Sequence, residues 1–234
     1  MNQNHFECKT VRRNFLTSIT AGIAAMGISA IVSPFKLSAS SKSNQTTDDL
    51  IKKDKNEAEA WFDKIKGRHK MVFDIAKPDG LFLTFTRNFL ESNNETGTPD
   101  SDLSAVIVLR HAAIILALKD TVWEKYKLGE FFNVKDEAAG GFALHNTYWD
   151  PKRNDNFPSN KSIDHLQKRG VLFCVCDTAL DNISEKIAQL RDVKKTTVKT
   201  DFYEGILPEI QLVPSGVWAL GRAQEKGCPY CYGS

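Results

Sequence analysis

The feature that most restricts the fold of this chain is a series of short apolar runs separated by segments with helical spacing. Runs of strand length occupy residues 81–85, 105–109, 171–176 and 210–213. Apolar runs without polar alternation indicate strands that are buried on both faces, as in a parallel sheet. We therefore expect an α/β fold with a mostly parallel sheet.

Helical patterns lie between these runs. The clearest begins directly after Cys176, and its apolar positions share one face: Leu180, Ile183, Ile187 and Leu190. Shorter helices are expected over residues 57–66, 162–168 and 215–226, and a glycine follows each of the last two. Strands joined through helices form right-handed crossovers, so the sheet should carry helices on both faces. The expected architecture has three layers, α/β/α.

Residues 133–160 interrupt this alternation. They contain Gly140-Gly141, Pro151, Pro158 and several Asn and Asp residues, so we expect a long loop. A loop of this length in a compact domain is often a lid or a binding loop.

The first 39 residues have the layout of a secretory signal. A basic segment with Arg12-Arg13 and then Phe15-Leu16 precedes an apolar stretch over residues 19–32. This stretch is shorter than the about 20 residues that a membrane-spanning helix needs, so no permanent membrane anchor is expected. The arginine pair favours the twin-arginine translocon, which delivers folded proteins to the periplasm, over the general secretory route. Cleavage is expected near Ala39 or Ser40.

Removal of this signal changes the charge of the chain. The whole sequence has a net charge of +2, but residues 1–39 hold four Lys and Arg residues against one Glu. That segment therefore carries +3, and the remaining chain carries −1. A nearly neutral domain lacks the basic surface that nucleic-acid binding needs, so we exclude nucleic-acid partners.

The remaining chain divides into three parts. Residues 40–56 are polar and predict a flexible linker. Residues 57–227 form the expected α/β domain, because 41% apolar residues suffice for a core. Residues 228–234 are expected to form a Cys-Pro-Tyr-Cys tail outside it.

Three candidate residues follow predicted strands, at the edge where ligands bind in open α/β sheets. They are His111, Cys176 and Ser215. Cys176 ends a strand and precedes a helix, whose N-terminus favours a thiolate, while the carboxylate of Asp177 opposes it. A buried core cysteine is the alternative reading of Cys176. Cys174, one step deeper on the same face, is expected to pack in the core.

The sequence gives less support to a catalytic or binding role for the other candidates. Ser215 fits a helix N-cap better than a nucleophile. His111 fits an acid or base, a metal ligand or a hydrogen-bonded core residue, but no second ligand stands beside it at suitable spacing. His145 lies in the long loop next to aromatic residues, and His165 lies on the polar part of a helix. We predict no metal site and no cofactor.

The chain ends with a Cys-Pro-Tyr-Cys motif at Cys228 and Cys231. In glutaredoxin-type redox centres this motif opens a helix, whose N-terminus lowers the pKa of the first thiol. Here it follows a helix, and too few residues remain for another. A flexible dithiol, a two-residue disulfide loop, half of a metal site and a disordered tail all remain open. In an oxidising compartment we expect a Cys228–Cys231 disulfide.

Several segments together resemble the DsrE/DsrF-like sulfur-relay family. The closest resemblance is to its exported branch, which has a twin-arginine leader and a terminal Gly-Cys-x-Tyr-Cys. Besides His111 and Cys176, the resemblance is carried by residues 100–109, 123–129, 212–217 and 215–228. It covers the chain from residue 69 to the end.

The resemblance implies a flavodoxin-like three-layer fold, assembly into homo-oligomers such as trimers or hexamers, and a persulfide on Cys176. Two departures stand out. Cytosolic members have Gly after the histidine where this chain has Ala112, and compact members lack the loop over residues 133–160.

Two functions remain open from the sequence. The first is a periplasmic protein that handles sulfane sulfur or thiol redox through Cys176, with Cys228 and Cys231 receiving or resolving the persulfide. The alternative is a non-catalytic ligand- or metal-binding module, which twin-arginine export also suits because cofactors are loaded before export. A purely structural oligomer is a third, simpler reading.

Overall fold

The computed structural model describes residues 57–136, 138–150 and 159–233. The expected signal over residues 1–39 and the linker over residues 40–56 lie outside the described residues. Among the described residues, no helix combines the length and the apolar character needed to cross a membrane.

The centre of the domain is a five-stranded sheet in the order β6-β5-β2-β1-β7. Its strands are β1 (His69–Ile75), β2 (Leu103–Leu109), β5 (Leu172–Cys176), β6 (Ile210–Val213) and β7 (Tyr230–Tyr232). Every neighbouring pair is parallel. The chain crosses the sheet in one direction from β1 to β6 and then returns to place β7 beside β1.

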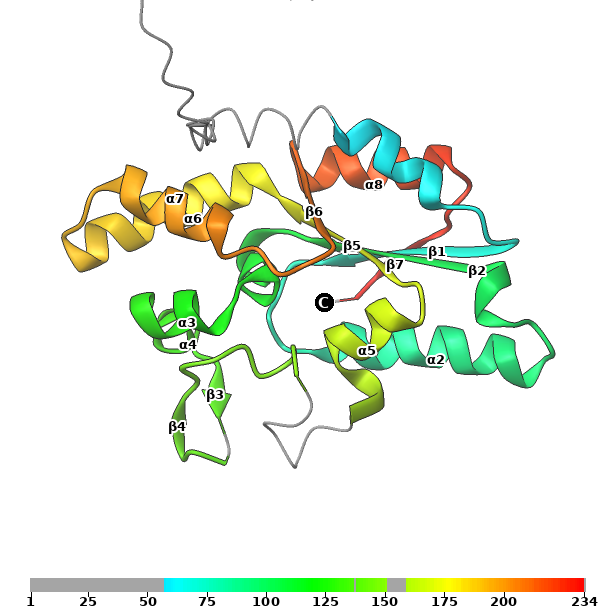
Figure 1. Cartoon of the computed structure of the whole chain (residues 1–234), viewed down its shortest axis with the longest axis horizontal. Helices are drawn as coiled ribbons and strands as arrows, with labels where there is room; N and C mark the ends of the chain where they lie inside the picture. Colours follow the sequence, from blue (N-terminus) through cyan, green and yellow to red (C-terminus); the bar gives the residue numbers. More distant parts are fainter. Residues whose placement is uncertain (1–56, 137, 151–158, 234) are drawn as a thin grey trace, which may run out of the picture. The chain divides into compact units, whose positions relative to one another are not determined.

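Helices cover both faces of this sheet, as Figure 1 shows for α8 on one side and α2 and α5 on the other. The helices are α2 (Leu81–Glu95), α3 (Asp120–Tyr126), α4 (Leu128–Phe131), α5 (Ile163–Lys168), α6 (Asp177–Arg191), α7 (Lys195–Glu204) and α8 (Gly216–Glu225). The expected α/β class and the flavodoxin-like three-layer α/β/α fold with a parallel sheet are confirmed.

The core is divided between the two faces of the sheet. Alternate residues of a strand point to opposite faces, so Val72 packs with α8 while Phe73 packs with the helices of the other face. The strand β2 is buried along its whole length because it lies in the middle of the sheet. Of the apolar face expected for α6, only Leu190 is exposed, at 57%.

One predicted strand is instead a helix. Residues 81–85 form the start of α2, and the first strand lies earlier, at β1. The buried positions of α2 follow helical spacing: Phe82, Leu83, Thr86 and Leu90. Gly80 precedes the helix with a φ of 70°, a conformation that favours glycine, and a Cβ there would meet the ring of Tyr148 at 2.3 Å.

The segment expected to be a long loop contains secondary structure of its own. Its described part forms a small antiparallel hairpin of β3 (Lys135–Asp136) and β4 (Gly141–Phe142). Asn146 then fixes the segment to the domain, because its side-chain amide donates to the carbonyls of Leu116 and Leu118. Residues 151–158 lie outside the described residues.

The C-terminal motif is part of the sheet rather than a tail outside it. Tyr230–Tyr232 form β7 and pair with β1. Two flanking backbone bonds extend this pairing, from the Val72 N–H to the Pro229 carbonyl and from the Gly233 N–H to the Asp74 carbonyl, both at 2.9 Å. The sequence hid this strand because three residues are too few to show a period.

Candidate functional site

Three of the predicted candidates come together at one place. A pocket of about 170 Å³ lies at the carboxyl ends of β2, β5 and β6. His111, Cys176 and Ser215 all line it. The structure therefore brings together the residues that the sequence placed after separate strands, as expected for the carboxyl edge of a parallel sheet.

Cys176 occupies the junction between β5 and α6. Its backbone is extended and ends the strand, while its sulfur acts as the N-cap of α6 by accepting the Ala179 N–H at 3.3 Å. This donor stabilises negative charge on the sulfur. The side chain is more enclosed than expected, with 6% of the residue exposed. A reagent therefore reaches Cys176 through the pocket.

Cys174 lies two residues earlier on the same strand and is fully buried. It packs in the cluster between the sheet and α8. Burial raises the pKa of the Cys174 thiol far above its ordinary value of 9.0. The expectation that Cys174 is a core residue is confirmed.

His111 has an unusual backbone conformation. It follows β2 and opens a 3-10 segment, His111–Ala117, with a φ of 48°. Positive φ is uncommon for residues other than glycine and carries a free-energy cost, and such residues cluster at functional sites. The side chain is exposed and lines the mouth of the pocket.

Arg110 is a pocket residue that the sequence analysis did not single out. Its guanidinium makes a bidentate pair with Asp74 of β1, with Nη2 at 2.8 Å from Oδ2, and this hydrogen bonding raises the pKa of Arg110 further. The hydroxyl of Tyr230 on β7 donates to the same carboxylate at 2.8 Å. The sequence did contain a signal for this ion pair: Asp74 lies inside an otherwise apolar segment, and Arg110 directly follows the next strand, β2.

Ser215 is the N-cap of α8. Its hydroxyl oxygen accepts the Trp218 N–H at 3.2 Å. The interpretation of Ser215 as a cap is therefore confirmed, although the residue also borders the pocket.

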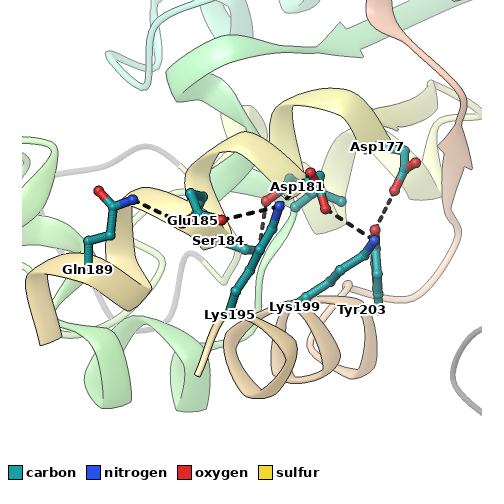
Figure 2. A network of polar contacts seen from close by, with 9 residues as sticks. Asp177, Asp181, Ser184, Glu185, Gln189, Lys195, Lys199 and Tyr203 are labelled. Atoms are coloured by element: carbon teal, nitrogen blue, oxygen red, sulfur yellow. Dashed lines mark hydrogen bonds and ion pairs between the residues drawn. The ribbon is translucent and has the colours of Figure 1, made fainter. Parts of the chain in front are cut away.

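The carboxylate of Asp177 is held by α7. Its Oδ1 accepts the hydroxyl proton of Tyr203 at 2.5 Å. Figure 2 shows this contact beside the ion pairs of Asp181 with Lys195 and Lys199, which join α6 to α7. Asp177 does not line the pocket. The structure thus separates the nearest carboxylate of α6 from the lining around Cys176.

A second hollow of about 290 Å³ adjoins the first. The two share His111, Ala179 and Asn182 as lining residues. The described part of the 133–160 segment contributes to neither, so these residues give no support to a role of that segment as a lid or binding loop at these two hollows.

Cys228 and Cys231 lie on opposite faces of the sheet. Cys228 packs in the cluster under α8, whereas Cys231 packs against the cluster on the other face. Both are free thiols in the structure. The expected disulfide between them is thus not formed, and the pairing of β7 with β1 holds the two sulfurs apart.

The tail thiols are also remote from Cys176. Cys231 lies in register with Phe73, Ile107 and Phe173, so three strand spacings separate it from β5. Each spacing is about 4.8 Å, and Cys176 lies three residues further along β5, which places the two sulfurs more than about 15 Å apart. The structure does not bring the tail cysteines to the candidate site of the same chain.

His145 and His165, the other two histidines considered from the sequence, lie elsewhere. His145 approaches Asp136, with 3.8 Å between Nδ1 and Oδ2, and His165 belongs to α5. Neither lines the pocket at Cys176. The described residues contain no cluster of three or more His, Cys, Asp or Glu side chains suited to a metal ion.

No model of a known protein family matches this chain, and no curated protein matches it. The enclosed thiol of Cys176 accepts a backbone N–H, and His111 and Arg110 line the same pocket, with the guanidinium of Arg110 paired to Asp74. This arrangement suits a nucleophilic sulfur that reacts with a small anionic or polarisable group.

Proposed function

We propose that the protein is a sulfur carrier in which the thiol of Cys176 accepts a sulfane sulfur atom and holds it as a persulfide. The observation that carries this proposal is the position of Cys176. Of the four described cysteines, it alone lines the pocket at the carboxyl ends of β2, β5 and β6, and its sulfur already accepts a backbone N–H. The resemblance to sulfur-relay proteins supports the same function.

The proposed step is a thiolate exchange. The Cys176 thiolate attacks the outer sulfur of a donor persulfide, the donor sulfur–sulfur bond breaks, and the donor leaves as a thiolate. The outer sulfur is then bonded to Cys176 as a persulfide, and no external oxidant or reductant is consumed. The Ala179 N–H, which the Cys176 sulfur accepts, stabilises the negative charge on that sulfur during the exchange.

His111 has a separate role in this proposal. An imidazole can act as a general acid and donate a proton to a leaving thiolate. Its exposed position at the mouth places it on the path of a departing donor. The cost of its backbone conformation is consistent with a residue held for such a role.

The setting of this function is also a proposal. The signal over residues 1–39 supports export of the folded chain to the periplasm through the twin-arginine translocon. The family resemblance supports a homo-oligomer. The tail cysteines of one chain do not reach its own Cys176, so a role for them in relay requires a second copy.

Alkylation kinetics of the reduced, folded protein test whether Cys176 has the reactivity that this function needs. We expect Cys176 to react at least about tenfold faster than Cys174. The pocket admits a reagent to Cys176, whereas burial raises the pKa of the Cys174 thiol and shields it from the reagent. Equal rates would make Cys176 a packing residue and would favour the binding-module alternative.

A further inference from the structure

The candidate site extends beyond the pocket at Cys176. The two adjoining hollows follow one face of α6, on which Ala179, Asn182 and Lys186 succeed one another at helical spacing. A helix rises about 1.5 Å per residue, so about 15 Å separates Cys176 from Lys186 along the helix axis. The hollows together form a groove of that length with the thiol at one end.

The far half of this groove has its own chemistry. Phe131 and Phe132 line it, with their rings in an edge-to-face arrangement at 4.8 Å between centroids. Lys186 is exposed and lines the same hollow. Lys195 and Lys199 of α7 are paired with Asp181, but within the described residues no carboxylate pairs with Lys186. The groove therefore offers an apolar wall followed by a cation that is open to a ligand.

An inorganic sulfur anion would occupy only the hollow at Cys176. The second hollow, of about 290 Å³, is the larger of the two and would have no occupant. A donor that fills both halves needs a sulfur at one end, an apolar or peptide-like body, and a negative charge at the other end. The charge complements Lys186, and the body packs on the phenylalanine rings.

We infer that the site exchanges sulfur with a low-molecular-weight organic persulfide whose body ends in a carboxylate, rather than with an inorganic polysulfide. This inference rests on the proposed function of Cys176. In the exchange, the outer sulfur of the donor is transferred to the Cys176 thiolate. The organic part of the donor becomes the leaving thiolate while its carboxylate is still paired with Lys186. The sulfur–sulfur bond of the donor breaks as the new one forms on Cys176.

The test compares three donors on the full mature chain: glutathione persulfide, the diethyl ester of that persulfide, and inorganic polysulfide. Mass spectrometry measures the rate at which Cys176 gains one sulfur atom. Lys186→Gln should raise the glutathione persulfide concentration needed for half-maximal rate by about threefold to fivefold, as expected for one exposed charge pair. The same variant should leave the rates with the ester and with polysulfide unchanged, and Lys186→Arg should restore the wild-type value.

A second variant tests the continuity of the groove. Asn182 is exposed and lines both hollows, so Asn182→Trp places a large side chain at their junction. We expect at least about a tenfold loss of rate with glutathione persulfide and little change with polysulfide. Lys66→Gln, an exposed substitution at a residue that lines neither hollow, is the matched control and should change nothing.

The outcomes separate the inference from the proposed function. If wild-type Cys176 gains sulfur from every donor, but Lys186→Gln and Asn182→Trp alter all donors equally or none, the organic-donor inference is overturned and the carrier function stands. If Cys176 gains sulfur from no donor, the carrier function itself is overturned.

Discussion

At the scale of single residues, the position of one pocket residue depends on an ion pair. Arg110 is held by Asp74, which lies on the neighbouring strand β1. Arg110 lines the pocket, and its partner Asp74 has a side chain that is 3% exposed. Tyr230 completes the cluster from β7. Arg110 is thus held in place by side chains of β1 and β7, the first and the last strand along the chain.

Removal of one partner of this pair should destabilise the protein. Arg110→Met leaves the Asp74 carboxylate buried without its cation, and we expect a loss of about 3 kcal/mol in the free energy of unfolding, measured by urea denaturation. The double variant Asp74→Asn/Arg110→Met should lose less than the sum of the two single variants. Lys226→Met, which breaks the exposed pair with Asp63, is the control and should change the free energy of unfolding far less, because solvent screens that pair. A loss at Arg110 no larger than at Lys226 would contradict the structural role of the pair.

At the scale of elements, β7 makes a prediction about the tail thiols. Burial raises the pKa of Cys228 to about 11 from an ordinary value of 9.0, with Lys70 opposing the shift. A raised pKa keeps the thiol protonated, so at pH 8 the reactive thiolate of Cys228 is about a hundredfold scarcer than in an unperturbed thiol. Alkylation of folded protein should therefore modify Cys231 first, and Cys228 should become reactive only as the pH approaches 11. Mass spectrometry of the two peptides across this range measures the order. Faster reaction of Cys228 at pH 8 would show that β7 does not stay in the sheet.

The strands of the sheet differ in how far they could be predicted from the sequence. The strands β2, β5 and β6 consist mostly of apolar residues, so their burial could be predicted, and with it the meeting of His111, Cys176 and Ser215. In β1 the run is broken by polar residues, among them Asp74, which belongs there because Arg110 neutralises it. The presence of Asp74 in the strand and of Arg110 at the sheet edge is explained only by the ion pair that they form in the folded chain. The strand β7 is likewise fixed by its partner β1 rather than by any pattern of its own.

At the scale of the whole molecule, we expect the chain to be exported as a folded protein. Replacement of Arg12-Arg13 by Lys-Lys should leave the precursor in the cytoplasm, because the twin-arginine translocon recognises that pair. Cell fractionation and immunoblotting measure the distribution, and a variant at Lys9 alone is the control that should be exported normally. Unchanged export of the double variant would point to the general secretory route.

Site-resolved mass spectrometry after exposure to a persulfide tests whether this fold presents Cys176 to a sulfur donor. We expect one sulfur atom to be added to the peptide that carries Cys176, and we expect a reductant to remove it. Cys176→Ser should abolish this addition, whereas Cys174→Ser should retain it, because that thiol is sealed in the core under α8. Sulfur added to Cys228 or Cys231 with none on Cys176 would contradict the account.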